Sequence, residues 1–411
     1  MTTGILEGVI VLDLTRFFSG PQSTLFLAGL GAEVIKVDDP RTGDPTAFAP
    51  PFVGPEGVSF ERKTDADMGI AYLKRARGKK STTLNLKSAA GRDVFLRMVE
   101  SADVVVENFS AGVADRLGIG YAELKRVNPG IVYCSLTGYG STGPDKDLKA
   151  YDLMVQAAVG LMSITGQDGA PPTKAGSPVS DAIAGVFAAM GIVSALLHRH
   201  RTGEGQAVDV SMADCLFSLI FDEPLDCYAR LGLNPRQGNR IMRFSPFNAY
   251  RSSDGWVTIG AATNEDWLAL LEVMGRGDLR DDKQLMSVGW RLANNEVVDR
   301  MVGQWASTLT TERIESLLAD AKVPCSAVRN IDEVLRWDQM VHRNMAAPLW
   351  NPLSNSPMEA SGASFPIKFG RVPGAFGRSA PVPGGDSDEV LGRLAGLTPD
   401  EVESLRRSGV V

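Results

Sequence analysis

The sequence predicts an α/β protein built on a parallel β-sheet that is covered by helices. Its 411 residues are enough for two or three domains, at about 100–200 residues each. Hydrophobic residues make up 44% and charged residues 22%, as is usual for soluble globular proteins. In the first third, short apolar runs rich in β-branched residues alternate with helix-length apolar patterns, which indicates βαβ units.

Local patterns place each element of this alternation. An apolar run at 9–14 is followed by the turn Ser19-Gly20-Pro21 and a helix that ends at Gly31. A second strand follows at 33–37, and the pattern then repeats along the chain. The later strands are expected at 82–86, 103–106 and 131–136, with helices over 90–101 and 112–127.

The pattern changes after about residue 240, where a smaller α+β domain is expected over 240–330. A hairpin signal at 247–261 has Gly255 at the last position of the turn. The tail at 350–388 is rich in Pro, Gly and Ser, and we expect it to wrap over a surface. The remaining expected helices are 152–163, 182–200, 215–231, 265–274, 295–309, 311–321 and 399–407, with a strand at 207–212.

Charge, cysteine and hydropathy patterns exclude several classes of protein. A net charge of −7 provides no general basic surface for nucleic acid and no polybasic membrane anchor. The four cysteines form no C-x-x-C pair, so we expect no metal site and a reduced, cytoplasmic setting. The start has no signal-peptide pattern. The uncharged stretch 182–197 has 16 residues where a membrane span needs about 20, so it is interpreted as a buried helix.

Two common kinds of active site are disfavoured. The turn after the first strand reads TRFFSGPQS, with the single glycine Gly20, so the glycine-rich loops that bind NAD or ATP phosphates are missing. Histidine chemistry has only His198, His200 and His342 available, and no G-x-S-x-G segment supports a serine triad. These histidines are interpreted as surface or capping residues.

A dense basic stretch comprises Lys74, Arg75, Arg77, Lys79 and Lys80. A solvated loop face is the ordinary interpretation of such a run. The alternative is a phosphate site, because the run leads into a parallel strand of an acidic protein.

Asp181 stands directly before the long apolar run. A helix N-cap is the ordinary interpretation of an aspartate there. The same position would keep a carboxylate nucleophile ionised and fixed in direction. Gly138, Tyr139 and Gly140 end a strand at the carboxyl edge of the sheet, where ligands of open α/β sheets bind, and Tyr151 and Asp152 follow.

Several long blocks, in order along nearly the whole chain, resemble the family III CoA-transferases. This group includes formyl-CoA transferase, the carnitine and bile-acid CoA-transferases, and the related α-methylacyl-CoA racemases. The blocks include LEGVIVLDLT and LGAEVIKVDDP within 6–44, RGKKSTTLNLKSAAGR at 77–92, DVVVENFSAGVADRLGIGY at 103–121, KAYDLMVQAAVGLMSITG within 138–166, PVSDAIAGVFAAMGIVSALLHRHRTGEGQAVDVSM at 178–212 and VPCSAV at 323–328.

The resemblance implies a Rossmann-like CoA-binding domain at 1–225, completed by 335–411, a small domain at 240–330, and linkers at 226–239 and 331–345. It also implies an interlocked homodimer. The substrates would be an acyl-CoA and a carboxylic acid, with no permanently bound cofactor. In these transferases the aspartate before the long helix is the nucleophile, and it falls on Asp181. The family's CoA contacts fall on Phe17, Ser19, Leu84, Lys87, Asn108, Phe109, Arg116 and Lys149; Tyr151 and Asp152 join the catalytic group, and Arg16, Phe18, Gly138, Tyr139 and Gly140 line the substrate cleft.

The sequence departs from the family pattern at several points. Asp39 stands where a relative has a basic residue, which Arg41 or the 74–80 run would replace. Only Gly238 is present where formyl-CoA transferase has a run of glycines, which argues against oxalate as the acceptor. Phe17 and Phe18 beside the thioester favour a bulkier or more apolar acid.

The expected reaction is CoA transfer through an aspartyl anhydride and an aspartyl-CoA thioester. Backbone N–H groups near Gly138–Gly140 or Gly185 would stabilise the oxyanion. A racemase is the first alternative, but racemases have a histidine at the position of Tyr151, and without it one of two opposed proton carriers is missing. A non-catalytic CoA-binding subunit of a heteromer is the second.

Overall fold

The computed structural model describes residues 4–411 and confirms the α/β class. The chain forms two compact units. The large unit contains the residues up to Val159, Gly176–Asp222 and Asp338–Val411, and the small unit contains Gly160–Ala175 and Glu223–Trp337.

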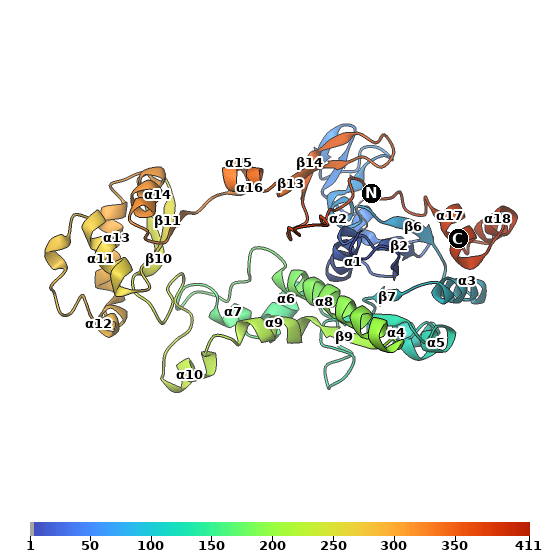
Figure 1. The fold of residues 1–411 in the computed structure, drawn as a ribbon, viewed down its shortest axis with the longest axis horizontal. Helices are drawn as coiled ribbons and strands as arrows, with labels where there is room; N and C mark the ends of the chain where they lie inside the picture. Colours follow the sequence, from blue (N-terminus) through green and yellow to red (C-terminus); the bar gives the residue numbers. More distant parts are fainter. Residues whose placement is uncertain (1–3) are drawn as a thin grey trace. The chain divides into compact units, whose positions relative to one another are not determined.

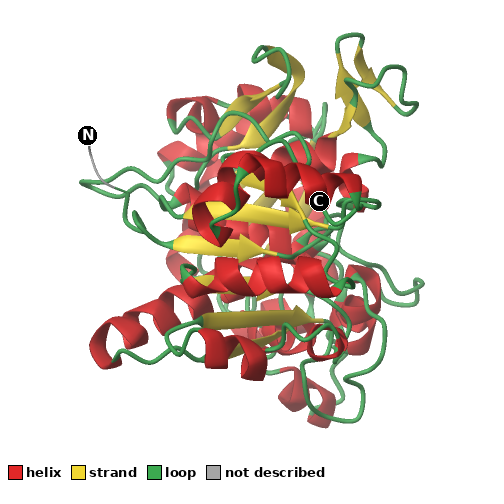
Figure 2. Cartoon of the chain, turned by 90° about the vertical axis from the view of Figure 1, so that its right-hand side faces the viewer, coloured by secondary structure: helices red, strands yellow, loops and turns green. Residues whose placement is uncertain are grey.

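A six-stranded parallel sheet forms the centre of the large unit (Figures 1 and 2). The strands run in the spatial order β6-β2-β1-β7-β8-β9, which is third, second, first, fourth, fifth and sixth along the chain within this sheet. The order reverses between β1 and β7, and such a switch opens a crevice at the carboxyl ends of the two strands. The bounds are β1 (Ile10–Asp13), β2 (Glu33–Asp38), β6 (Lys80–Thr83), β7 (Val104–Glu107), β8 (Val132–Thr137) and β9 (Ala207–Ser211).

Helices cover both faces of this sheet. Leu12 of β1 and Leu14 directly after it belong to the apolar cluster under α3, whereas Asp13 accepts a hydrogen bond from Thr24 of α1. Neighbouring side chains of a strand point to opposite faces, so α3 and α1 lie on opposite sides. The helices of this region are α1 (Ser19–Gly29), α3 (Ala89–Glu100), α4 (Val113–Arg116), α5 (Tyr121–Val127), α6 (Asp152–Ala158), α8 (Val179–Thr202) and α9 (Met212–Ile220).

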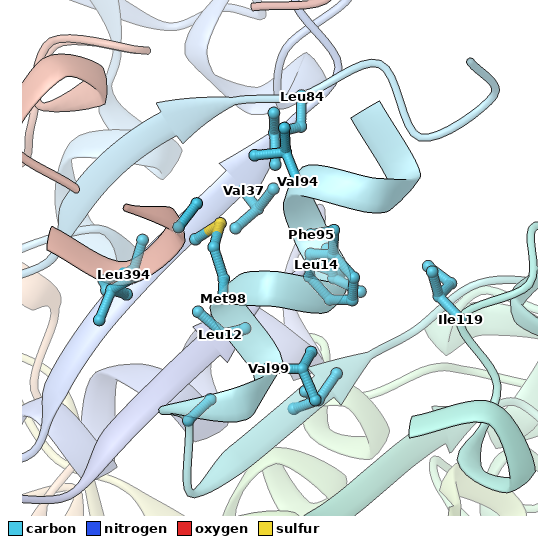
Figure 3. Close-up of a cluster of buried hydrophobic side chains, with 14 of the residues drawn as sticks. Leu12, Leu14, Val37, Leu84, Val94, Phe95, Met98, Val99, Ile119 and Leu394 are labelled. Carbon is cyan, nitrogen blue, oxygen red and sulfur yellow. The ribbon is translucent and has the colours of Figure 1, made fainter. Parts of the chain in front are cut away.

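The C-terminal tail builds part of the core. Its helix α17 packs against α3 and β6, and Leu394 lies beside Met98 and Leu12 in the cluster drawn in Figure 3. The expected final helix is confirmed, but the tail does more than wrap a surface. Its elements are α16 (Asp338–His342), the antiparallel pair β13 (Ala346–Trp350) and β14 (Pro357–Ala363), α17 (Ser387–Ala395) and α18 (Pro399–Arg407).

Residues between β2 and β6 form an excursion that the alternation pattern did not predict. It contains a short 3₁₀ helix, a three-stranded antiparallel sheet and one helix that leads into β6. Their bounds are η1 (Pro45–Ala47), β3 (Phe52–Gly54), β4 (Gly57–Ser59), β5 (Met68–Gly69) and α2 (Ile70–Arg75).

In the small unit the predicted hairpin and the three helices after it are confirmed. The hairpin strands gain a third partner, β12, and the helices cover an apolar cluster around Trp267. The bounds are α7 (Leu161–Ile164), α10 (Leu225–Arg230), β10 (Phe247–Arg251), β11 (Trp256–Gly260), α11 (Asn264–Val273), η2 (Gly277–Leu279), α12 (Val288–Ala293), α13 (Asn295–Ala306), α14 (Thr311–Asp320), β12 (Cys325–Ala327) and α15 (Ile331–Arg336).

Two long helices predicted from periodicity are each divided. The segment 112–127 breaks at Gly118, whose φ of 72° is left-handed and ends α4 before α5 begins. The segment 215–231 breaks before Pro224, which caps α10. In both places a glycine or a proline ends the helix, although the spacing of apolar residues continues beyond it.

The apolar helix α8 is only partly buried, which corrects the expectation of a fully buried helix. Ala184, Ala188 and Ile192 are inaccessible, whereas Val186 and Met190 are more than half exposed. By length and composition α8 could cross a membrane, with 44% of its apolar window buried. Core helices of soluble proteins also satisfy this criterion, so it is weak evidence for a membrane span.

Candidate active site

Asp181 is the third residue of α8, and the helix is capped by Pro178. The N-cap interpretation is therefore wrong, although a carboxylate in the first turn still benefits from the helix dipole. One turn later, an added Cβ on Gly185 would lie 2.8 Å from the carbonyl oxygen of Ser19. The missing side chain at Gly185 thus lets the start of α1 approach α8 close to Asp181.

The surroundings of Asp181 raise its pKa to about 6. Burial is the main cause, since it disfavours the charged form. Hydrogen bonding by the Ser19 side chain opposes the shift, the negative charge of Asp152 adds to it, and the positive charge of Arg75 opposes it. The carboxylate is therefore more basic and less well solvated than an ordinary aspartate while keeping a hydrogen-bond donor beside it.

Asp152 holds the start of α8 in place. Its Oδ1 accepts hydrogen bonds from the Ser180 backbone N–H at 2.9 Å and from the Ser180 hydroxyl at 2.6 Å. Its Oδ2 accepts one from Nε2 of Gln156 at 2.6 Å. The carboxylate is buried in these contacts and orients the residue just before Asp181.

The loop after β1 is fixed across the switch point of the sheet. The side chain of Asn108, after β7, accepts a hydrogen bond from the Arg16 N–H at 2.9 Å and donates one to the Arg16 carbonyl at 2.8 Å. Phe17 has a φ of 70°, which is unusual for a residue with a side chain. Nη1 of Arg75 donates to its carbonyl oxygen at 2.9 Å and thereby supports this conformation.

A buried ionic network lies beneath the same loop. Nζ of Lys79 is 2.9 Å from Oδ2 of Asp13 and also donates to the carbonyl of Pro21 in α1. Nζ of Lys36 donates to the Thr15 carbonyl at 2.7 Å. Burial acts to raise the pKa of Asp13, but the charges of Lys79 and Lys36 outweigh it and hold this pKa below its usual value. The network fixes both ends of the loop that carries Ser19.

Three of the five cations in the basic run at 74–80 have partners within the fold. The side chain of Lys79 is inaccessible, Arg77 donates to the Ala363 carbonyl, and Lys80 pairs with Glu389 at 2.7 Å. Arg77 and Lys79 are buried in these contacts, so at these two positions the interpretation as a solvated loop face is wrong.

A cavity of about 270 Å³ opens beside Asp181. A second cavity of about 460 Å³ shares five lining residues with it, including Phe109 and Lys146. The first cavity is lined by Phe17, Ser19, Asn108, Phe109, Ser110, Ala111, Leu136, Thr137, Gly138, Lys146, Leu148, Lys149, Ala150, Tyr151, Asp181 and Met212.

The predicted site residues divide into three groups according to the cavity that they line. Eight of them line the cavity beside Asp181, namely Phe17, Ser19, Asn108, Phe109, Gly138, Lys149, Tyr151 and Asp181 itself. Arg116 lines only the second cavity. Leu84 is buried in the apolar core, and Lys87 is exposed. Neither cavity is lined by Arg16, Phe18, Leu84, Lys87, Tyr139, Gly140 or Asp152.

Sequence reasoning missed Lys146, Thr137 and Met212. Lys146 is exposed and lines both cavities, so it brings a positive charge to their junction. Its signal in the sequence was its place in the loop after β8, at the carboxyl edge of the sheet, where ligands are expected.

Two of the glycine N–H groups expected to stabilise an oxyanion, those of Gly140 and Gly185, have other partners. The N–H of Gly140 donates to Oγ1 of Thr137 at 2.9 Å. Gly185 lies inside α8, where its N–H belongs to the helical hydrogen-bond ladder. The start of α1 offers better donors, because the first N–H groups of a helix have no partner within it. Within residues 4–411, no group of three or more His, Cys, Asp or Glu side chains could hold a metal ion.

Comparison with known proteins identifies the family. The family model described as CoA-transferase family III matches residues 6–387. The chain is a family III CoA-transferase. As a member of this family, the enzyme acts on CoA thioesters and carboxylates.

The transferase has relatives along nearly its whole length. It is 36% identical to succinyl-CoA:mesaconate CoA-transferase of Haloarcula marismortui over 94% of this chain and 96% of that protein. It is 32% identical to succinate–glutarate CoA-transferase of Agrobacterium fabrum over 95% of each chain. Its fold matches the crystal structure of a CAIB/BAIF family protein from Brucella suis, with a TM-score of 0.82, 29% identity, and coverage of 96% of this chain and 100% of that one.

Proposed function

We propose that the transferase moves CoA from an acyl-CoA to a carboxylic acid through covalent intermediates on Asp181. The observation that carries the proposal is the position of Asp181. Its half-buried carboxylate lines the cavity, faces a hydrogen-bond donor on Ser19 at the start of α1, and has a raised pKa. A carboxylate in this state is a suitable nucleophile towards a thioester.

In the first half-reaction, a carboxylate oxygen of Asp181 attacks the thioester carbonyl and expels CoA thiolate, which gives a mixed anhydride. The thiolate then attacks the aspartyl carbonyl of the anhydride, so that the donor acid leaves and an aspartyl-CoA thioester forms. An acceptor carboxylate attacks this thioester, and CoA thiolate attacks the acceptor side of the new anhydride. Asp181 is then a carboxylate again, and no external energy source is consumed.

The start of α1 stabilises the negative oxygen that forms in each attack. The hydroxyl and N–H of Ser19 are beside Asp181, and Gly20 follows at the second position of the helix. Removing one such donor typically costs about 10²–10³ in kcat.

The two adjoining cavities support the predicted CoA contacts. Phe17, Asn108, Phe109 and Lys149 line the first cavity and Arg116 the second, so an extended ligand can follow both. Lys146 is added to this set as a further cation for the phosphates.

We also propose an interlocked homodimer in the cytoplasm. The apolar side chains of Val186, Met190 and Leu197 on α8 are more than half exposed, and a second copy would cover them. The four free cysteines fit a reducing compartment. Closure by a second copy would also keep water away from the reactive anhydride.

Racemisation is disfavoured by the geometry. Tyr151 replaces the histidine that a racemase needs, and its ring packs edge-on to Phe17 with 6.3 Å between the centroids. Asp152 is occupied with Ser180 and Gln156. The site thus has one reactive carboxylate and lacks the opposed pair of proton carriers. A non-catalytic subunit is disfavoured too, because Asp181 and its donors are in place.

A trapping experiment tests the proposal. Incubation with acyl-CoA and hydroxylamine should convert Asp181 to a hydroxamate that mass spectrometry locates, and an Asp181→Ala variant should bind CoA without turnover. Full turnover with unmodified Asp181 would refute the nucleophilic role.

A further inference from the structure

The guanidinium group of Arg75 is held at a fixed position beside the loop of the active site. Arg75 is the last residue of α2. Its Nη1 donates to the carbonyl of Phe17 at 2.9 Å, and its guanidinium carbon is 3.8 Å from the centroid of the Phe18 ring. Stacking on the ring face leaves the edges of the guanidinium free for hydrogen bonds.

Arg75 has no ion-pair partner within residues 4–411. The salt bridges of this region use its neighbours: Lys79 pairs with Asp13, and Lys80 pairs with Glu33 and Glu389. Arginine has five N–H donors, and the bond to Phe17 uses one of them. A half-buried, unpaired and immobilised guanidinium is ready to bind a carboxylate in a bidentate manner.

The site that Arg75 adjoins is that of Asp181. Phe17 and Ser19, which bracket Phe18 in the loop, both line the Asp181 cavity. The positive charge of Arg75 opposes the rise that burial causes in the pKa of Asp181, so the two groups interact electrostatically. An acyl group joined to Asp181 therefore extends from a point within electrostatic range of this cation.

We propose that Arg75 binds the second, non-reacting carboxylate of a short dicarboxylic acid and so determines the substrate class of the transferase. The inference rests on the proposed function, because it takes Asp181 as the point of attachment. A dicarboxylate joined to Asp181 through one end has a free carboxylate at the other end. Arg75 supplies the charge and the donors for that group, and a monocarboxylic acid of the same length leaves them unused.

Two observations agree with this substrate class. Two relatives are named as CoA-transferases for mesaconate and for glutarate, which are dicarboxylic acids. The face of the Phe18 ring, which from the sequence favoured an apolar acid, is covered by the guanidinium of Arg75. Phe18 therefore supports a cation, whereas Phe17 lines the cavity.

The test compares acids of matched length in wild-type and Arg75→Met enzyme, with acetyl-CoA and succinyl-CoA as donors. Acceptors are succinate against butyrate and glutarate against valerate. Rates are divided by the fraction of Asp181 that hydroxylamine labels, so that only competent enzyme is counted. We expect Arg75→Met to lower kcat/KM for the dicarboxylic acids by about 10- to 100-fold and to change it less than about threefold for the monocarboxylic acids. Arg75→Lys should recover part of the loss.

Arg378→Met is the matched control, since Arg378 also stacks on an aromatic ring, that of Trp350 at 5.1 Å, and lies in the C-terminal tail. Arg378→Met should leave kcat/KM unchanged for both the dicarboxylic and the monocarboxylic acids. Equal losses for both classes in Arg75→Met, or no loss for the dicarboxylic acids, would overturn the inference while labelled Asp181 still supported the proposed function. An unlabelled Asp181 in active wild-type enzyme would instead overturn the proposed function.

Discussion

At the scale of single residues, the raised pKa of Asp181 follows from the balance between its burial and the hydrogen bond and positive charge beside it. Its pKa of about 6 lies above that of an ordinary aspartate because burial raises it more than the hydrogen bond from Ser19 and the charge of Arg75 lower it. An acid whose pKa is raised in the folded state is protonated, and so not nucleophilic, at pH values below that pKa. Ionised Asp181 is accordingly favoured as pH rises through about 6.

This balance predicts the pH profile of the enzyme. We expect kcat/KM to fall about tenfold per pH unit below pH about 6 and to be level above it. Because hydrogen bonding by Ser19 lowers the pKa of Asp181, Ser19→Ala should move the inflection to higher pH. Initial rates at saturating acceptor would measure both. A level profile down to pH about 4, where an ordinary aspartate titrates, would contradict this account.

The sequence pointed to Asp181 as the candidate nucleophile but not to the contacts that its neighbours make. Its place before a long apolar run and the family resemblance both pointed to it. The unpaired state of Arg75 could not be predicted, because the run of basic residues at 74–80 looks uniform until folding pairs Lys79 and Lys80 with distant carboxylates. The positioning role of Asp152 was likewise hidden, since it depends on a contact with Ser180 that is 28 positions away.

At the scale of elements, the close approach of α1 and α8 creates the site. Glycine at position 185 leaves room for the backbone carbonyl of Ser19. A Cβ added to Gly185 would lie only 2.8 Å from that carbonyl oxygen. Backbone cannot give way as a flexible side chain can, so one of the two helices would have to move.

Because α1 and α8 lie so close together at Gly185, we predict that Gly185→Ala lowers kcat by about 10- to 100-fold. A small displacement of hydrogen-bond donors from the reacting atoms reduces the rate by about this factor. Gly392→Ala is a matched control within α17, where the added Cβ would meet its nearest neighbour at an ordinary 3.5 Å. It should leave kcat unchanged and, as an alanine in a helix interior, stabilise the fold slightly. Steady-state kinetics and thermal unfolding of both variants measure the difference. Normal kcat in Gly185→Ala would contradict the role of the helix contact.

Strands and helices with a clear pattern of apolar residues were predictable from the sequence. Elements whose ends are set by a single helix-breaking residue were not. The strands β1, β2, β7 and β8 were found from apolar runs within a few residues of their ends. The helix predicted over 112–127 failed because Gly118 adopts a left-handed conformation that the apolar period does not reveal. The three short strands between β2 and β6 carry too few residues for a period of two to be recognised.

At the scale of the whole molecule, the strand order places the site. The reversal between β1 and β7 puts the loops after these strands beside each other, and Asn108 bridges them through its two hydrogen bonds to Arg16. The sequence predicted a site at the carboxyl edge of a parallel sheet. It could not reveal the strand order from alternation alone, because the order depends on which crossovers reverse direction.

The contribution of the tail was also larger than its composition suggested. A segment rich in Pro and Gly was expected to cover a surface, but it delivers α17 to the core, where Val390, Leu391 and Leu394 are buried with the side chains of α3. Nine residues of helix in a long irregular segment are a weak pattern in the sequence, and their burial depends on a sheet built from the other end of the chain.

Isotope transfer provides the most direct measurement of the covalent role of Asp181. When an acceptor acid labelled with ¹⁸O in its carboxylate is converted to its CoA thioester, the bridging oxygen of the anhydride must remain on Asp181. Trypsin should cut after Lys174, which separates the peptide with Asp181 from the peptide with Asp152 and provides an internal control. We predict heavy oxygen in the Asp181 peptide after turnover and none in the Asp152 peptide. Turnover that leaves the Asp181 peptide without heavy oxygen would contradict the account.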